Sequence, residues 1–254
     1  MPIDYARSLT SEQRSLRSDR HLGFALAFVA GAANAGAFLA VNVYTSHMTG
    51  VVSSMADHIA LGQVTLVVSG LGAVLSFLLG AMASALMISF AKRHRLRSSY
   101  ALPLLLEAVL LLVFGMLGAR LETVQGLFVP MTVMLLCFMM GLQNAVISNI
   151  SGAAVRTTHL TGVITDLGIE LGRLLYWNRR RGPPVERVVA DRRKLATLAL
   201  LCAFFLGGGV AGALGFKHVG YLMTLPLAAL LVVLSVVPVI DDLRQPRWGE
   251  RGPL

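Results

Sequence analysis

The chain has 254 residues, of which 56% are hydrophobic and only 14% charged, and its formal net charge is +9. Soluble domains are about 45–50% apolar and about 25% charged, so the composition excludes an ordinary soluble domain. The charges lie between long apolar runs. We therefore interpret the basic excess as topology control rather than a nucleic-acid surface, and the expected partner is the lipid bilayer, with no nucleic acid.

Residues 1–21 are polar and basic, and they predict a cytoplasmic N-terminal segment. Apolar runs follow at about 22–43, 66–91, 101–118, 127–149, 195–215 and 221–240. Each is near the roughly 20 residues that a spanning helix needs, and lipid-exposed sheet edges would leave backbone groups unpaired. The sequence therefore predicts an all-α membrane protein with six transmembrane helices, a basic cytoplasmic loop at 178–194 and a cytoplasmic tail at 241–254.

Two further segments, 46–63 and 157–177, are shorter in apolar content. The first carries Asp57 and His58, and the second carries Asp166, Glu170 and Arg173. We predict that both are broken or re-entrant half-helices, although the sequence alone leaves open whether they span.

Polar motifs recur in the same order in two parts of the chain. Residues 31–35 (GAANA) match 141–145 (GLQNA), and 46–52 (SHMTGVV) match 158–164 (THLTGVI). Weaker matches join 77–80 (FLLG) to 204–207 (FFLG) and 102–104 to 225–227. Recurrence of this kind indicates an internal repeat, with membrane repeat 1 at 22–126 and membrane repeat 2 at 127–240.

The basic residues predict opposite orientations for the two repeats. With six spans and same-side short segments, all but two of the 22 Lys and Arg residues lie on the cytoplasmic side, the exceptions being Arg120 and Lys217. Eight spans would distribute these residues less asymmetrically. Three spans per repeat invert the second half, and both termini are then cytoplasmic.

The repeated His-x-Thr-Gly element is the candidate substrate site. Each copy stands where an apolar run stops and a short helix is predicted, and nearby Ser and Thr hydroxyls, such as Ser46 and Thr49, are plausible N-caps. Paired helix breaks of inverted repeats are typical of a midplane solute site, and helix N-termini favour anions. The candidate substrate-binding residues are His47, Thr49, Gly50, His159, Thr161, Gly162, Asn34 and Asn144. The alternative is that the breaks are tight turns and that the amides join helices.

Glu107 lies in the middle of an apolar run, where a charge is costly and usually functional. We expect it to couple protons or ions, together with Asp57 and Asp166, unless those two lie at the solvated interface. No metal or other cofactor is expected, because two histidines are too few for a typical metal site. We expect no catalytic set and no enzymatic activity.

The motifs at 46–50, 141–145 and 157–162 resemble those of the YoaK-like family of bacterial inner-membrane proteins, a domain of unknown function. The resemblance covers about 22–240 and implies a multi-pass protein of the bacterial inner membrane. Members often carry Asp in place of Asn34 and Tyr in place of His159. The favoured function is transport or facilitated passage of a small polar or anionic solute; the alternative is a membrane scaffold or partner-binding module, and a homo-oligomer remains open.

Overall fold

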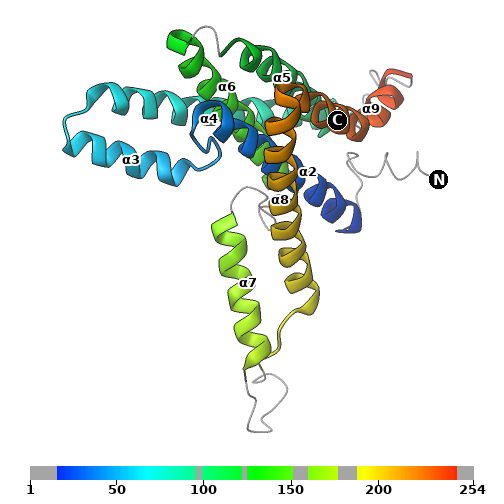
Figure 1. Ribbon diagram of the computed structural model, residues 1–254. Helices are drawn as coiled ribbons and strands as arrows, with labels where there is room; N and C mark the ends of the chain where they lie inside the picture. Colours follow the sequence, from blue (N-terminus) through cyan, green and yellow to red (C-terminus); the bar gives the residue numbers. More distant parts are fainter. Residues whose placement is uncertain are drawn as a thin grey trace.

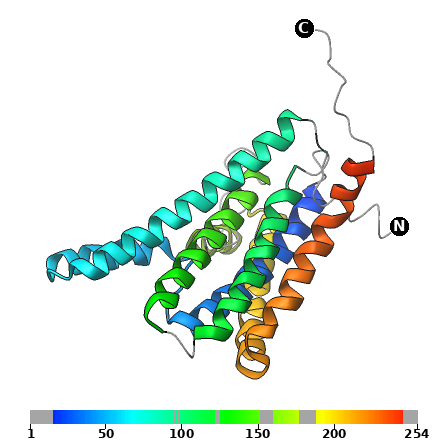
Figure 2. The same cartoon turned by 90° about the horizontal axis from the view of Figure 1, so that it is seen from above.

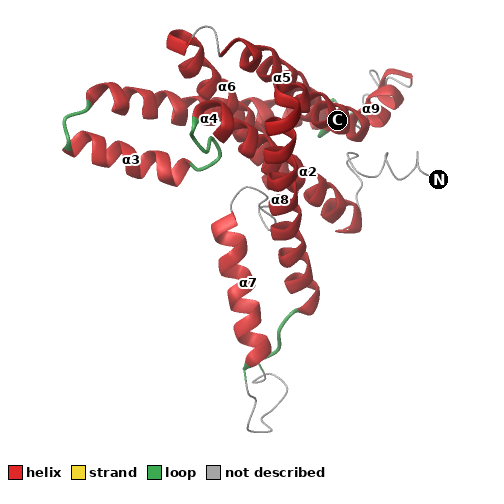
Figure 3. Ribbon diagram, viewed as in Figure 1, coloured by secondary structure: helices red, strands yellow, loops and turns green. Residues whose placement is uncertain are grey.

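The computed structural model describes residues 16–94, 96, 99–121, 125–150, 160–176 and 188–244. The described residues form helices joined by short connections, without a strand among them (Figure 3). The predicted all-helical class is therefore confirmed.

Eight α-helices and one 3-10 turn follow one another in the described part of the chain (Figure 1). They are α2 (Leu16–Val41), α3 (Met48–Ala60), α4 (Val64–Arg93), α5 (Ala101–Leu121), α6 (Gln125–Ile150), α7 (Leu160–Leu175), α8 (Arg192–Val219) and α9 (Thr224–Arg244), with the short 3-10 turn η2 (Gly220–Met223) between the last two. Helix α2 begins at Leu16, within the polar N-terminal segment predicted at 1–21. The helix is therefore longer than its apolar run, which starts at about residue 22.

Five segments of the described chain are long and apolar enough to cross a membrane. The last of them, Arg192–Val236, is 45 residues long and contains both α8 and the start of α9. By contrast, α3 has 13 residues and α7 has 16. At 1.5 Å per residue they extend about 20 and 24 Å, less than the roughly 30 Å of a hydrocarbon core. Length and composition thus support a membrane protein in which α3 and α7 are short elements.

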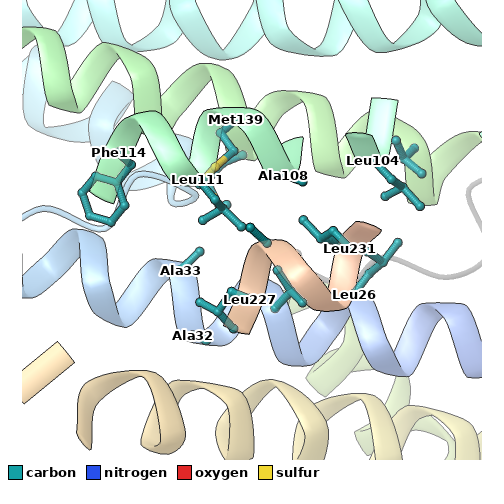
Figure 4. Packing of buried hydrophobic residues seen from close by; sticks show 14 of the residues in the cluster. Leu26, Ala32, Ala33, Leu104, Ala108, Leu111, Phe114, Met139, Leu227 and Leu231 are labelled. Carbon is teal, nitrogen blue, oxygen red and sulfur yellow. The ribbon is translucent and has the colours of Figure 1, made fainter. Parts of the chain in front are cut away.

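The core lies where helices from distant parts of the chain pack together. The most extensive packing joins α2 to α8, α4 to α6 and α5 to α9. Leu104 and Leu111 of α5 and Leu227 and Leu231 of α9 are almost completely buried in this core, beside Met139 of α6 (Figure 4). Seen from above, α2, α4, α5, α6 and α9 run in a similar direction across the bundle (Figure 2).

Glycines allow two of these helix pairs to approach backbone to backbone. A Cβ on Gly31 would overlap the carbonyl oxygen of Phe205, and a Cβ on Gly208 would overlap that of Phe28. The same arrangement joins α4 to α6, where Gly80 faces the carbonyl of Phe138 and Gly141 faces that of Phe77. Such small-residue contacts are a principal means of packing helices in lipid, where the hydrophobic effect gives little attraction between helices.

These contacts change the register of one sequence match. Gly80 corresponds in its surroundings to Gly208 and not to Gly207, since nothing lies within 4 Å of a Cβ on Gly207. The match of 77–80 to 204–207 was therefore wrong by one residue. Adjacent glycines at 207–209 made both registers plausible in sequence, and only packing distinguishes them.

Two helical hairpins project from the bundle (Figure 1). We call α3 with the first part of α4 arm 1, and α7 with the first part of α8 arm 2. In arm 1, Met55 lies against Gly70, and no residue of α3 is buried. In arm 2, Val163 packs with Leu198 and Leu201. Each arm begins at one of the predicted helix breaks.

Replacing Gly208 with Ala should destabilise the protein, because the added methyl group has no room against the Phe28 carbonyl. Overpacking of this kind costs about 1–3 kcal/mol. The free energy of unfolding in detergent micelles measures the effect. Gly207→Ala is the matched control, with open space at its Cβ; equal stability of the two variants would contradict the described α2–α8 contact.

Candidate functional site

The first predicted break is present between α2 and α3. Helix α2 ends at Val41, and Asn42 has a positive φ of 55°, a conformation that terminates helices and that Asn tolerates better than most residues. The backbone N–H of His47 donates to the Tyr44 carbonyl at 3.1 Å, and α3 starts at Met48. The sequence prediction of a helix break at the first His-x-Thr-Gly element is thus confirmed.

The break brings the two repeated motifs of the first half into contact. The hydroxyl of Ser46 donates to the Oδ1 atom of Asn34 on α2 at 3.1 Å. The neighbouring Thr45 is fully buried, and its hydroxyl has no hydrogen-bond partner among the described residues. Buried polar atoms without partners are uncommon, and they point to a bound ligand, an ordered water or a free-energy penalty in the folded state. Asn34, Thr45 and Ser46 therefore form a polar cluster at the start of arm 1.

His47 lies at the start of α3 and packs on its first turn. A Cβ on Gly50 would overlap Cδ2 of the His47 ring and lie 2.7 Å from Nε2, so Gly50 leaves the space that the imidazole occupies. His47 is itself the N-cap, and no side chain caps the helix. The predicted capping by Ser46 or Thr49 was therefore wrong: Ser46 is engaged by Asn34, and Thr49 is exposed within the helix.

The second break lies partly outside the described residues, and so does His159. Helix α7 begins at Leu160, so that Thr161 and Gly162 belong to its first turn, where both are exposed. Thr161 does not cap the helix; its carbonyl accepts from the Thr165 hydroxyl at 2.8 Å. Helices α3 and α7 share no extensive packing, so the contacts do not bring these residues together with His47.

Two predicted amide positions on α6 are buried. Asn144 is 8% exposed, and Gln143 is fully enclosed. The Gln143 Nε2 atom donates to the Leu26 carbonyl of α2 at 3.2 Å, whereas its Oε1 atom has no partner among the described residues. Gln143 therefore joins the first helices of the two halves, as expected of an amide between membrane helices.

Glu107 is fully buried on α5, and neither of its carboxyl oxygens has a hydrogen-bond partner in the described part of the chain. Its helix neighbours Leu104, Ala108 and Leu111 belong to the apolar core (Figure 4). Ionising a carboxyl in such surroundings costs several kcal/mol or more. Buried hydroxyls without partners occur on the neighbouring helices, Ser84 on α4 and Thr132 on α6. The predicted burial of Glu107 is present in the structure, and the group is suited to holding a proton.

The other predicted carboxylates differ from Glu107. Asp57 is exposed on α3, and Asp166 is half-exposed with its carboxylate 3.9 Å from the Lys194 amine. Neither is enclosed by the bundle. The described residues contain no group of three or more His, Cys, Asp or Glu side chains that could hold a metal ion.

Glu170 is the buried carboxylate that the sequence analysis did not select as a site residue. Its Oε1 atom lies 2.8 Å from the Arg173 guanidinium and 3.6 Å from the Lys194 amine, and its Oε2 atom accepts from the Asp191 backbone N–H at 3.0 Å. The spacing of Glu170 and Arg173 along one helix was visible in sequence. The contacts across to α8 were not, because they depend on how the connecting loop returns.

Asp191 caps α8 at the tip of arm 2. Its carboxylate accepts from the backbone N–H groups of Lys194 and Arg193, at 3.1 and 2.9 Å. The pKa of Asp191 is lowered chiefly by the hydrogen bond from the Lys194 N–H. Desolvation opposes this effect, while the Arg193 N–H and the charges of Arg193 and Lys194 lower the pKa further. The capped helix start and the Glu170 ion pairs together hold arm 2 as one unit.

Residues 22–237 match a family described as "Protein of unknown function (DUF1275)", and the chain belongs to this family. The resemblance to YoaK-like proteins is consistent with that membership. No curated protein and no solved structure matches the chain. The family assignment supports a membrane protein of unknown function and brings no known activity to the site.

Replacing Glu170 with Gln should loosen arm 2, since a neutral amide weakens the contacts to Arg173 and Lys194 in a buried position. A loss of roughly 1–3 kcal/mol in the free energy of unfolding is expected, as for other hydrogen bonds to buried charged groups. Asp166→Asn is the control, because exposed pairs contribute about 0–1 kcal/mol. Faster amide hydrogen exchange in α7 would accompany the loss; unchanged exchange and stability would contradict the structural role of Glu170.

Proposed function

We propose that the protein is a secondary transporter or facilitator of a small polar or anionic solute in the bacterial inner membrane. The enclosed carboxyl of Glu107 carries this proposal. An ionisable group without a partner inside a membrane bundle is expensive, and such groups usually serve ion or proton pathways. In this proposal Glu107 binds and releases the coupling proton, and no catalytic residue or enzymatic step is involved.

We further propose six spans, with α3 and α7 re-entrant and the halves 22–126 and 127–240 inverted. In support of this, the first helix of each half crosses the third helix of the other: α2 crosses α8, and α6 crosses α4, through equivalent glycine contacts. The last helices of the halves, α5 and α9, pack on each other. Cytoplasmic termini then follow from the distribution of Lys and Arg.

The solute would bind where the breaks interrupt the helices. At the first break, Asn34, Thr45 and Ser46 offer an amide and hydroxyls, and His47 lies beside them. The free N–H groups at the start of α3 favour an anionic or strongly dipolar group. By the proposed symmetry, Asn144, His159, Thr161 and Gly162 would form an equivalent but separate site at the second break, because α3 and α7 share no extensive packing. Asp57 and Asp166 have no part in it, because neither is enclosed by the bundle.

A second candidate function is a scaffold that binds another membrane helix. The exposed side of α7 favours it, since nothing lies within 4 Å of a Cβ on Gly168 or Gly172 and small residues permit close helix approach. A scaffold would show association without solute flux. The flux measurement therefore distinguishes the two functions.

Glu107→Gln should abolish solute-driven proton movement while leaving the protein folded, because the amide keeps the shape but cannot carry the proton. The assay uses liposomes with an entrapped pH indicator and outward gradients of inorganic phosphate, small carboxylates and amino acids in turn. Asp57→Asn is the control, because it also changes a carboxylate to an amide but at an exposed position outside the α5 core. The proposal fails if no solute of the panel moves protons through the wild type, or if Glu107→Gln behaves like the wild type.

A further inference from the structure

Arm 2 has an unpartnered apolar stripe along α7. Ile164, Leu171 and Leu175 are 55%, 41% and 81% exposed, and their spacing of seven and four residues places them on one side of the helix. Gly168 lies between them with open space beside it. The stripe is thus a continuous apolar surface and not a set of scattered leucines.

Another side of α7 is occupied by its packing on α8. Val163 is buried against Leu198 and Leu201, and Glu170 is enclosed by its ion pairs. These contacts fix the rotation of α7 about its axis. The apolar stripe lies about 100° around the helix from Val163 and Glu170, and its residues remain exposed beside this packed side.

Two arginines stand at the tip of the same arm. Arg192 and Arg193 begin α8 and both are exposed. Neither forms a salt bridge with a described carboxylate, although the charge of Arg193 also acts on the neighbouring Asp191. The nearby acidic groups are already engaged: Glu170 by Arg173 and Lys194, Asp166 by Lys194, and Asp191 by the backbone N–H groups of α8. The guanidinium groups of Arg192 and Arg193 are therefore available to an external anion.

The geometry points to an anionic phospholipid as the partner of this surface. We propose that arm 2 enters the cytoplasmic leaflet as a hairpin, that Ile164, Leu171 and Leu175 lie among the acyl chains, and that Arg192 and Arg193 bind the headgroup phosphate at its tip. A guanidinium matches phosphate geometry and binds it in bidentate fashion. Basic groups next to a span attract anionic lipids.

Three observations favour lipid over a protein partner. The candidate span Arg192–Val236 begins at these arginines, so the tip belongs at a membrane boundary. The exposed apolar surface continues along α8 through Leu200 and Phe204. At about 24 Å, α7 reaches from a headgroup layer into the hydrocarbon but not across it. The charged end and the apolar stripe thus match the two layers of a leaflet.

The test compares thermal unfolding in nanodiscs of phosphatidylcholine alone with nanodiscs that also contain phosphatidylglycerol. The wild-type melting temperature should rise with phosphatidylglycerol, and Arg192→Gln with Arg193→Gln should lose at least half of that rise. The double control Arg93→Gln with Lys217→Gln removes the same charge from exposed positions elsewhere and should keep the rise. Arg192→Lys with Arg193→Lys keeps the charge and should keep most of it.

The proposal is overturned if the glutamine variant retains the full rise, if the double control loses as much, or if inorganic phosphate gives the wild type the same rise without the lipid. A glutamine variant that melts lower in both nanodiscs but shows the same rise also overturns it. Because the readout is stability and not flux, the result does not depend on the transport role of Glu107.

Discussion

The backbone contacts at Gly31 and Gly141 hold together segments that lie far apart in the chain. Gly31 brings α2 against the Phe205 carbonyl of α8, and Gly141 brings α6 against the Phe77 carbonyl of α4. In lipid, helices gain little from the hydrophobic effect on association, so close van der Waals contact and weak Cα–H···O bonds supply the attraction. A side chain at either position would separate the helices. The apolar core to which α5 and α9 contribute would then be less tightly packed.

This tight packing leaves several enclosed polar groups without hydrogen-bond partners. With the bundle closed around it, the Glu107 carboxyl is left among leucines with no partner in the described chain, and the Thr45 hydroxyl is likewise unpaired at the first break. A chain selected only for stability would replace such groups by apolar ones, because an unsatisfied buried polar atom costs about 1–3 kcal/mol. Their presence in a largely apolar bundle, together with the unpaired hydroxyls of Ser84 and Thr132, is the physical reason for proposing a transport function.

Much of the fold followed from the sequence because the bilayer constrains it strongly. Apolar run lengths predicted the long helices, and the short polar segments at 46–63 and 157–177 became α3 and α7. The break before α3 was also predictable from Ser46, His47 and Gly50, as was the burial of Glu107 from its apolar flanks. Contacts that depend on side-chain direction were not: Ser46 bonds Asn34 instead of capping α3, and Glu170 meets Lys194 across a loop. Asp57 is exposed on α3, whereas the sequence left open whether it would be enclosed or lie at the interface.

The inverted relation of the two halves is the claim on which the proposed site depends, and thiol labelling of intact cells tests it most directly. Single cysteines would replace Gln63, Arg93 and Lys217 in a variant with Cys137→Ala and Cys202→Ala, and a membrane-impermeant reagent would be added from outside. The inverted arrangement predicts labelling at positions 63 and 217 and none at 93. Labelling at 93 and 217 with protection at 63 would mean that α3 and α7 cross the membrane and that the halves are parallel, which contradicts the proposed midplane site.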